Sequence, residues 1–203
     1  HYSKVVLGLH MDGANAGTAF VDTAGKTVTA TNATTSTTQF KFGTAASFTG
    51  AASYLTVANH ADFDFGSGDF CIEFFVRPAT VSAVKGFLAK RTSNATFAPF
   101  VIRMDATSHV VAESSLNGTT FGVSITSAAT LSATTWYHIA YTRSGNVFTL
   151  YIDGTASGTP VTLSGALTTN ADVVVIGSAD TGGSLQLDGY IDDLRITKGA
   201  ARY

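Results

Sequence analysis

The sequence has little charge and almost no cysteine, and these shortages limit the class of protein to which it can belong. Charged residues make up 13% of the 203 positions, against a usual fraction of about 25%. The single cysteine, Cys71, cannot form a disulfide within the chain, so we interpret it as a packed small side chain. With a formal net charge of −2, the chain has no basic patch for nucleic acid.

Long apolar runs are also missing. No run approaches membrane-spanning length and no signal peptide is recognisable, so we predict no membrane insertion. The sequence begins at His1 without an initiator methionine and stops at Tyr203, shortly after a strand-like segment. We therefore expect residues 1–203 to form one domain of a longer polypeptide.

What is present favours an all-β domain. Hydrophobic residues make up 45% of the chain, which excludes a disordered protein. A chain of this length suits one sandwich or barrel that buries roughly 70% of its unfolded surface. No window shows sustained helical periodicity, whereas short strand-like segments recur between turn residues.

Two stretches show the strand pattern most clearly. Within Asp69–Pro78 apolar residues recur at every second position. One face is therefore expected to carry Phe70, Ile72, Phe74 and Val76. Trp136–Arg143 and Val147–Ile152 are separated by a short polar turn and predict a hairpin. Further strands are expected at Lys4–Leu9, Ala52–Val57, Gly86–Arg91, Phe100–Met104, His109–Ser114, Phe121–Ile125, Asp172–Gly177 and Leu187–Ile196.

The Thr-rich segment Lys26–Phe40 is compatible with an edge strand or with a long surface loop. Many short strands with regular turns predict an antiparallel two-sheet sandwich. Neither an internal repeat nor a linker is recognisable, so we assign a single domain.

Three segments in order, Phe42–Pro78, Leu131–Gly154 and Ile176–Tyr203, resemble the laminin G-like, concanavalin A-like jelly-roll family. The final stretch "GYIDDLRITKGAARY" is most similar to copies of this domain in bacteriophage virion and tail-associated proteins. The resemblance implies two stacked antiparallel sheets, one of them curved. It also implies binding of glycans or protein surfaces far more often than catalysis, although a fold does not fix a function.

One face of the predicted hairpin is a candidate ligand-binding surface. His138 and Tyr151 lie on its non-core face, and Phe75 and Glu73 lie on the non-core face of their own strand. If these strands are neighbours, the four side chains form one surface of flat rings and hydrogen-bonding groups, which suits a sugar. The alternative is an ordinary solvated sheet face covered by a loop. Trp136, the only tryptophan, is expected to pack in the core rather than to serve as a sugar platform.

The adjacent carboxylates Asp192 and Asp193 stand in the middle of an apolar strand, where they repel each other. The resemblance implies a structural calcium ion at Asp192, helped by carbonyls near the first strand. Asp12 is the expected second side chain and Asp22 a weaker third, among glycines that free carbonyls to turn toward an ion. The alternative is an Asp192 carboxylate that accepts hydrogen bonds from backbone N–H groups in a bulge.

Catalysis is not expected. The related β-glucanases need paired carboxylates on one strand, whereas this chain has only two glutamates, Glu73 and Glu113, on different segments. No G-x-S-x-G motif is present either.

We therefore predict a non-catalytic module that binds glycans or bacterial surface polysaccharide on a phage particle, as part of a tail fibre or capsid appendage. The alternatives are a structural virion protein whose contacts are neighbouring virion subunits, and an accessory carbohydrate-binding domain of a secreted bacterial enzyme. The expected location is the virion surface or, for the last alternative, the extracellular medium.

Overall fold

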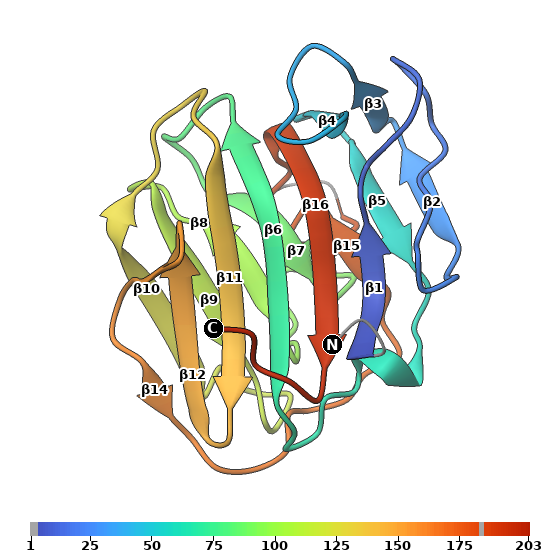
Figure 1. Cartoon of the computed structure of the whole chain (residues 1–203). Helices are drawn as coiled ribbons and strands as arrows, with labels where there is room; N and C mark the ends of the chain where they lie inside the picture. Colours follow the sequence, from blue (N-terminus) through green and yellow to red (C-terminus); the bar gives the residue numbers. More distant parts are fainter. Residues whose placement is uncertain (1–3, 183–184) are drawn as a thin grey trace.

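Two antiparallel sheets stack face to face in the computed structural model, which describes residues 4–182 and 185–203 (Figure 1). This confirms the predicted all-β jelly-roll sandwich. The front sheet of Figure 1 has the order β13-β12-β11-β6-β16-β4-β3, with β1 paired to β16 and β14 to β12. Its strands are β1 (Val5–Leu9), β3 (Thr34–Ser36), β4 (Ala45–Thr49), β6 (Phe70–Pro78), β11 (Tyr137–Ser144), β12 (Val147–Ile152), β13 (Thr155–Ala156), β14 (Val161–Thr162) and β16 (Asp188–Lys198).

The back sheet has the order β10-β9-β8-β7-β15-β5-β2. Its strands are β2 (Val28–Thr31), β5 (Tyr54–Val57), β7 (Lys85–Ala89), β8 (Val101–Met104), β9 (His109–Ser114), β10 (Val123–Thr130) and β15 (Val174–Ile176). A 3-10 turn, η2 (Ala61–Phe63), follows β5.

The core lies between the sheets and is built from the faces that the alternation predicts. In β6 the side chains of Phe70, Ile72, Phe74 and Val76 are fully buried, and Phe74 meets Phe87 of β7 edge to face. Burying each such side chain contributes about 1.5–3 kcal/mol. Cys71 on the opposite face is buried and unpaired, as expected of a small packed side chain.

Two sequence expectations need refinement. The segment Lys26–Phe40 forms neither one edge strand nor one loop, because β2 lies at the edge of the back sheet and β3 at the edge of the front sheet. Trp136 is half-buried and outside the core, since β11 begins one residue later with the pair Tyr137–Val76.

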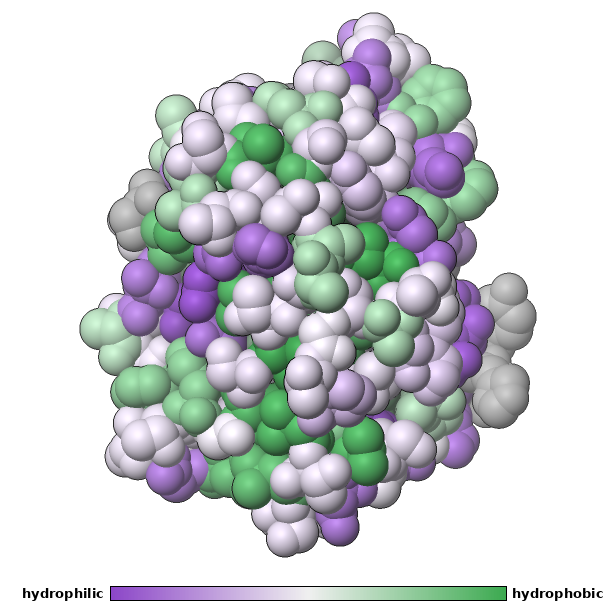
Figure 2. Space-filling model, turned by 90° about the vertical axis from the view of Figure 1, so that its left-hand side faces the viewer, coloured by the Kyte–Doolittle hydropathy of each residue, from purple (hydrophilic) through white to green (hydrophobic). Residues whose placement is uncertain are grey.

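The surface reflects the unusual composition. The side of the sandwich in Figure 2 is covered mainly by pale residues of intermediate hydropathy, with hydrophilic residues in small groups and apolar patches between them. This agrees with a chain in which only 13% of residues are charged. Among the described residues, no helix has the length and apolar character that crossing a membrane requires.

Candidate functional site

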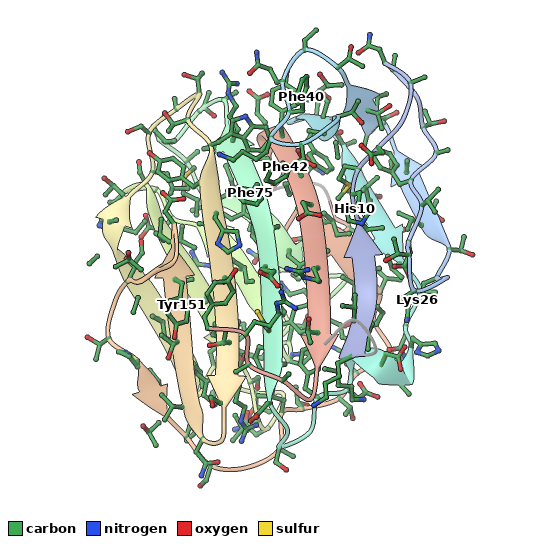
Figure 3. All side chains as sticks on the ribbon, in the orientation of Figure 1. His10, Lys26, Phe40, Phe42, Phe75 and Tyr151 are labelled. Carbon is green, nitrogen blue, oxygen red and sulfur yellow. The ribbon has the colours of Figure 1, made fainter. Side chains whose placement is uncertain are left out.

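The four predicted ligand-binding residues come together on the outer face of the front sheet. Strand pairing places His138 opposite Phe75, and Ala140 opposite both Glu73 and Tyr151. The His138 ring lies 4.9 Å from the ring of Phe75, measured between centroids. The period of two predicted the face on which each residue lies, and the pairing of β11 with β6 supplies the neighbourhood that the prediction required (Phe75 and Tyr151 are labelled in Figure 3).

Glu73 is buried below this face and is fully engaged by protein groups. Its Oε1 lies 2.9 Å from the Nε atoms of both Arg195 and Arg202. Its Oε2 accepts a 2.7 Å hydrogen bond from the Tyr203 hydroxyl and lies 3.6 Å from Nε2 of His138. Glu73 therefore positions neighbouring side chains and does not present free oxygens to a ligand.

The electrostatics of Glu73 follow from these contacts. Burial by itself raises the pKa of this carboxyl, but hydrogen bonds from His138, Arg195 and Tyr203 outweigh burial and lower the pKa to about 2. Glu73 is therefore ionised throughout the physiological pH range.

The C-terminal segment contributes a residue that the sequence alone did not mark as part of the site. Tyr203 packs on Tyr151, with ring centroids 5.4 Å apart, and on His138 at 5.5 Å. The ring of Tyr203, with 44% of its surface exposed, therefore covers part of the predicted platform at Tyr151. The ion pair between Arg202 and Glu73 and the hydrogen bond from Tyr203 to Glu73 hold this segment in place.

A second missed element is the loop of residues 37–44, which joins β3 to β4. Phe42 is 53% exposed and meets Phe75 edge to face, with centroids 5.3 Å apart. The Lys41 Nζ lies 5.4 Å above the ring of Phe75. The available sequence signal was the pair of phenylalanines, Phe40 and Phe42, beside a lysine in a Thr-rich loop.

Asp192 holds this loop in place. Its Oδ2 accepts hydrogen bonds from the backbone N–H groups of Lys41 and Phe42, at 2.7 and 2.8 Å. Its Oδ1 accepts one from the N–H of Asp193 at 2.8 Å. Burial raises the pKa of Asp192 in spite of these three donors. The sequence-level alternative, an aspartate that accepts backbone N–H groups, describes this geometry.

The two aspartates stand where β16 changes partner. Residues before Asp192 pair with β4, residues from Leu194 onward pair with β1, and the register with β6 shifts between Asp192 and Arg195. Asp193 has a φ of 44°, in the left-handed region, and its side chain is 34% exposed. Its Oδ1 lies 2.9 Å from Nδ1 of His10.

The three aspartates proposed as calcium ligands are not assembled in this arrangement. Asp22 accepts N–H groups of Gly8, Ala24 and Lys26 at 2.8–3.0 Å, while Asp12 is exposed. Within residues 4–182 and 185–203, no group of three or more His, Cys, Asp or Glu side chains could hold a metal. N–H donors fill the positions at Asp192 and Asp22 where a cation would bind, so these donor sets do not fit calcium. The geometry therefore favours the backbone N–H arrangement over the calcium ion expected at Asp192, and a melt with added calcium tests the choice.

A depression of about 480 Å³ opens above these residues and is called the front depression. Its polar groups include Asp153, whose Oδ1 accepts the backbone N–H of His138 at 2.8 Å. Its lining includes Phe42, Phe75, His138, Asp153, Arg195 and Tyr203. Aromatic faces beside a few polar groups are typical of a site for a flat, partly apolar ligand such as a sugar ring.

The two glutamates do not form a hydrolytic pair. Glu73 lies in the front sheet, whereas Glu113 lies in β9 of the back sheet. Glu113 is held by Arg103 through two hydrogen bonds of 3.0 and 3.2 Å.

Comparisons with known proteins agree on the fold. The binding domain of Paraclostridial Mosquitocidal Protein 1 aligns with 98% of this chain, with a TM-score of 0.74 and 15% identity. This chain spans about half (50%) of that domain. It is similar to Domain 4 of AbnA, a GH43 extracellular arabinanase from Geobacillus stearothermophilus, in complex with arabinotriose. That match has a TM-score of 0.68 and 16% identity and covers 97% of this chain and 93% of that one.

The receptor binding domain of botulinum neurotoxin D is similar as well, with a TM-score of 0.67, 14% identity, and coverage of 98% of this chain and 50% of that chain. A search of curated proteins gives no significant match. Residues 48–202 match the family model described as the concanavalin A-like lectin/glucanases superfamily. Since this match covers more than half of the sequence, the chain belongs to the laminin G-like domains of the concanavalin A-like lectin/glucanase superfamily.

Proposed function

We propose that the chain is a non-catalytic module that binds glycans in the front depression. One observation carries the proposal: the rings of Phe42, Phe75 and Tyr203 meet Arg195 in a single depression on an otherwise weakly polar surface. Arg195 donates only its Nε, to Glu73, and its two Nη groups have no hydrogen-bond partner among the described residues. Such donors beside aromatic rings can orient a sugar through its hydroxyl groups.

The structural neighbours support a binding role. Two of them are toxin binding domains, and a third was solved with arabinotriose. At 14–16% identity they share the fold with this chain, so the identity of the glycan is left to experiment.

The absence of catalysis is also part of the proposal. A glycosidase needs a protonated general acid and a second carboxylate at a fixed separation. Glu73 is ionised at neutral pH and enclosed by its ion pairs, and Glu113 belongs to the other sheet. We expect no release of reducing ends from a polysaccharide panel.

We propose that the protein is located on the surface of a phage particle, because the sequence of residues 189–203 resembles that of domains in phage virion and tail-associated proteins. Cryo-electron microscopy or antibody labelling of the particle tests this placement. Binding to bacterial surface polysaccharide would then favour an appendage, whereas burial of the front depression by neighbouring virion subunits would favour a structural component.

A glycan array with three variants tests the binding proposal. Phe42→Ala removes a wall of the depression and should weaken binding at least about fivefold, close to 1 kcal/mol. Phe40→Ala is the matched control, because Phe40 is 45% exposed in the same loop but does not line the depression. Tyr151→Ala should also weaken binding, because it removes the support of Tyr203.

Affinity per domain should be weak, millimolar to micromolar, and raised by multivalent display. An array profile without any binding, or one that Phe42→Ala leaves unchanged, would exclude a glycan site in the front depression.

A further inference from the structure

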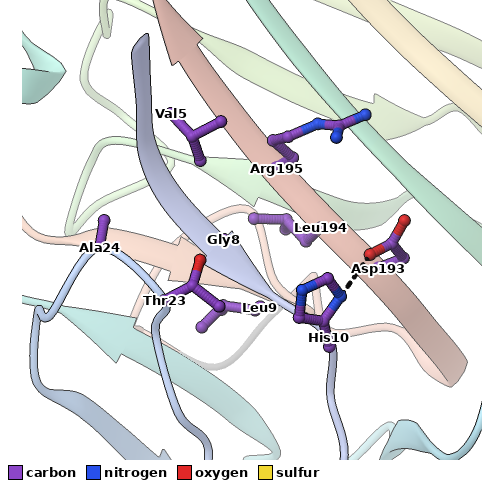
Figure 4. Close-up of a pocket in the computed structure, with 9 residues that line it drawn as sticks. All are labelled: Val5, Gly8, Leu9, His10, Thr23, Ala24, Asp193, Leu194 and Arg195. Atoms are coloured by element: carbon purple, nitrogen blue, oxygen red, sulfur yellow. Dashed lines mark hydrogen bonds and ion pairs between the residues drawn. The ribbon is translucent and has the colours of Figure 1, made fainter. Parts of the chain in front are cut away.

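We infer that the glycan ligand is an oligosaccharide chain that crosses β16 and continues from the front depression into a second pocket beside His10. This inference rests on the proposed function and extends it to the length and path of the ligand. The second pocket, called the His10 pocket, has a volume of about 230 Å³ and lies between β1, residues 23–24 and β16 (Figure 4).

The two hollows share a wall. Asp193 and Arg195 line the front depression and also line the His10 pocket. They lie on β16, between β6 on one side and β1 on the other. A ligand that contacts Arg195 from the front depression is therefore directly beside the His10 pocket.

Hydrogen-bonding groups remain available along this wall. His10 uses Nδ1 for Asp193, which leaves its Nε2, the second carboxylate oxygen of Asp193 and the Nη groups of Arg195 without a partner in the described ranges. Both members of the His10–Asp193 pair are accessible, with 63% and 34% of their side-chain surface exposed. A carboxylate, an imidazole and a guanidinium in a row present acceptors and donors to the alternating hydroxyls of a sugar chain.

The rest of the His10 pocket is apolar or weakly polar. Val5, Ala24 and Leu194 contribute aliphatic lining, and Thr23 contributes a hydroxyl. An aliphatic lining with polar groups at one wall accommodates the C–H face of a sugar ring.

The strand order sets the length of the path. From His138 on β11 to His10, which directly follows β1, the sheet runs β11-β6-β16-β1, which is three strand spacings. At about 4.8 Å per spacing the path is roughly 14 Å. Figure 3 shows Phe75, Phe42 and His10 spread across this width of the front sheet. A single sugar can fill only one part of it, so the chemistry points to a chain of several residues.

The test is a chain-length series on the intact chain, using arabino-, cello- and malto-oligosaccharides of one to six residues and isothermal titration calorimetry. For the series that binds, wild-type affinity should rise about tenfold, or 1.4 kcal/mol, between two and six residues. His10→Ala should bind the shortest bound ligands like the wild type and lose that rise.

Two further variants make the result specific. His60→Ala is the matched control, because His60 forms a similar surface pair with Asp62 at 3.1 Å outside both hollows on the front face. It should leave every affinity unchanged. Phe42→Ala should weaken all lengths, including the shortest, because it acts in the front depression. Melting curves should show that each variant is folded.

The outcomes separate the two proposals. Wild-type protein that binds short and long chains equally, or a His10→Ala variant that keeps the rise with length, would overturn the extended path and leave the front depression as the site. Equal losses at every length in His10→Ala would also overturn the extended path. No binding of any chain by wild-type protein would remove the proposed function together with this inference.

Discussion

Glu73 in the front sheet and Glu113 in the back sheet are both buried beside arginine, yet the two pairs are used differently. Arg103, on the neighbouring strand, donates two hydrogen bonds to Glu113, one to each carboxylate oxygen. Glu73 is shared by Arg195, Arg202 and Tyr203, and Arg195 donates to it through Nε alone. The comparison teaches that one buried carboxylate can hold residues 202–203 against the sheet and still leave the Nη groups of Arg195 available to a ligand.

The largest expected effect comes from neutralising the front carboxylate. Glu73→Gln removes the charge that two guanidinium groups face in a buried setting, so it should cost about 3–4 kcal/mol of unfolding free energy. Glu113→Gln breaks one ion pair, with Arg103, and the Glu113 side chain is 12% exposed against 3% for Glu73, so this variant should cost about 1 kcal/mol. Urea denaturation of the variants measures both values, and equal losses would contradict the asymmetry.

The pH dependence of stability should follow Glu73. Its pKa falls from the ordinary value of 4.5 to about 2 on folding. Its contribution is therefore complete above about pH 5 and is lost as the pH falls toward 2. Since each pKa unit corresponds to about 1.4 kcal/mol, the loss is on the order of 3 kcal/mol.

Denaturation between pH 2 and 7 tests this dependence. The wild-type curve should be steeper than that of Glu73→Gln over the acidic range. Parallel curves for wild type and Glu73→Gln would show that another group carries the acid sensitivity.

A smaller effect should separate the adjacent aspartates. Asp192→Asn keeps the shape of the side chain but replaces one acceptor oxygen by a donor facing backbone N–H groups, so it should cost about 2 kcal/mol. Asp193→Asn disturbs an exposed contact with His10 and a charge interaction with Arg195, and should cost less than about 1 kcal/mol. Thermal melts rank the two variants, and a larger loss for Asp193→Asn would contradict the anchoring role of Asp192.

The same geometry predicts the smallest effect for calcium. Because backbone N–H groups occupy Asp192, added calcium should move the melting temperature of chelator-treated protein by less than about 2 °C. A bound ion at one hundred times its dissociation constant would instead add about 2.7 kcal/mol, or roughly 5–11 °C. A rise of that size, lost in Asp192→Asn and kept in Asp193→Asn, would establish the metal that the family resemblance implies.

Much of this site was predictable because its strands are consecutive or strongly patterned. The hairpin of β11 and β12 and the alternation of β6 place His138, Phe75, Glu73 and Tyr151 on one face. The same reasoning missed Phe42, which lies in a loop without periodicity. It also placed Trp136 in the core, because the sequence does not mark the residue at which a ladder begins.

The sequence by itself determined the all-β class, the strands with strict alternation and the side chains that face the core, because side-chain direction in a strand has a local period of two. Only the tertiary structure decided the role of Asp192, whose partners Lys41 and Phe42 lie 151 and 150 residues away. It also decided that β16 pairs with β4 and then with β1, and that Tyr203 covers Tyr151. These features depend on which distant backbone groups need a partner once the sheets have stacked, and local sequence carries no record of that pairing.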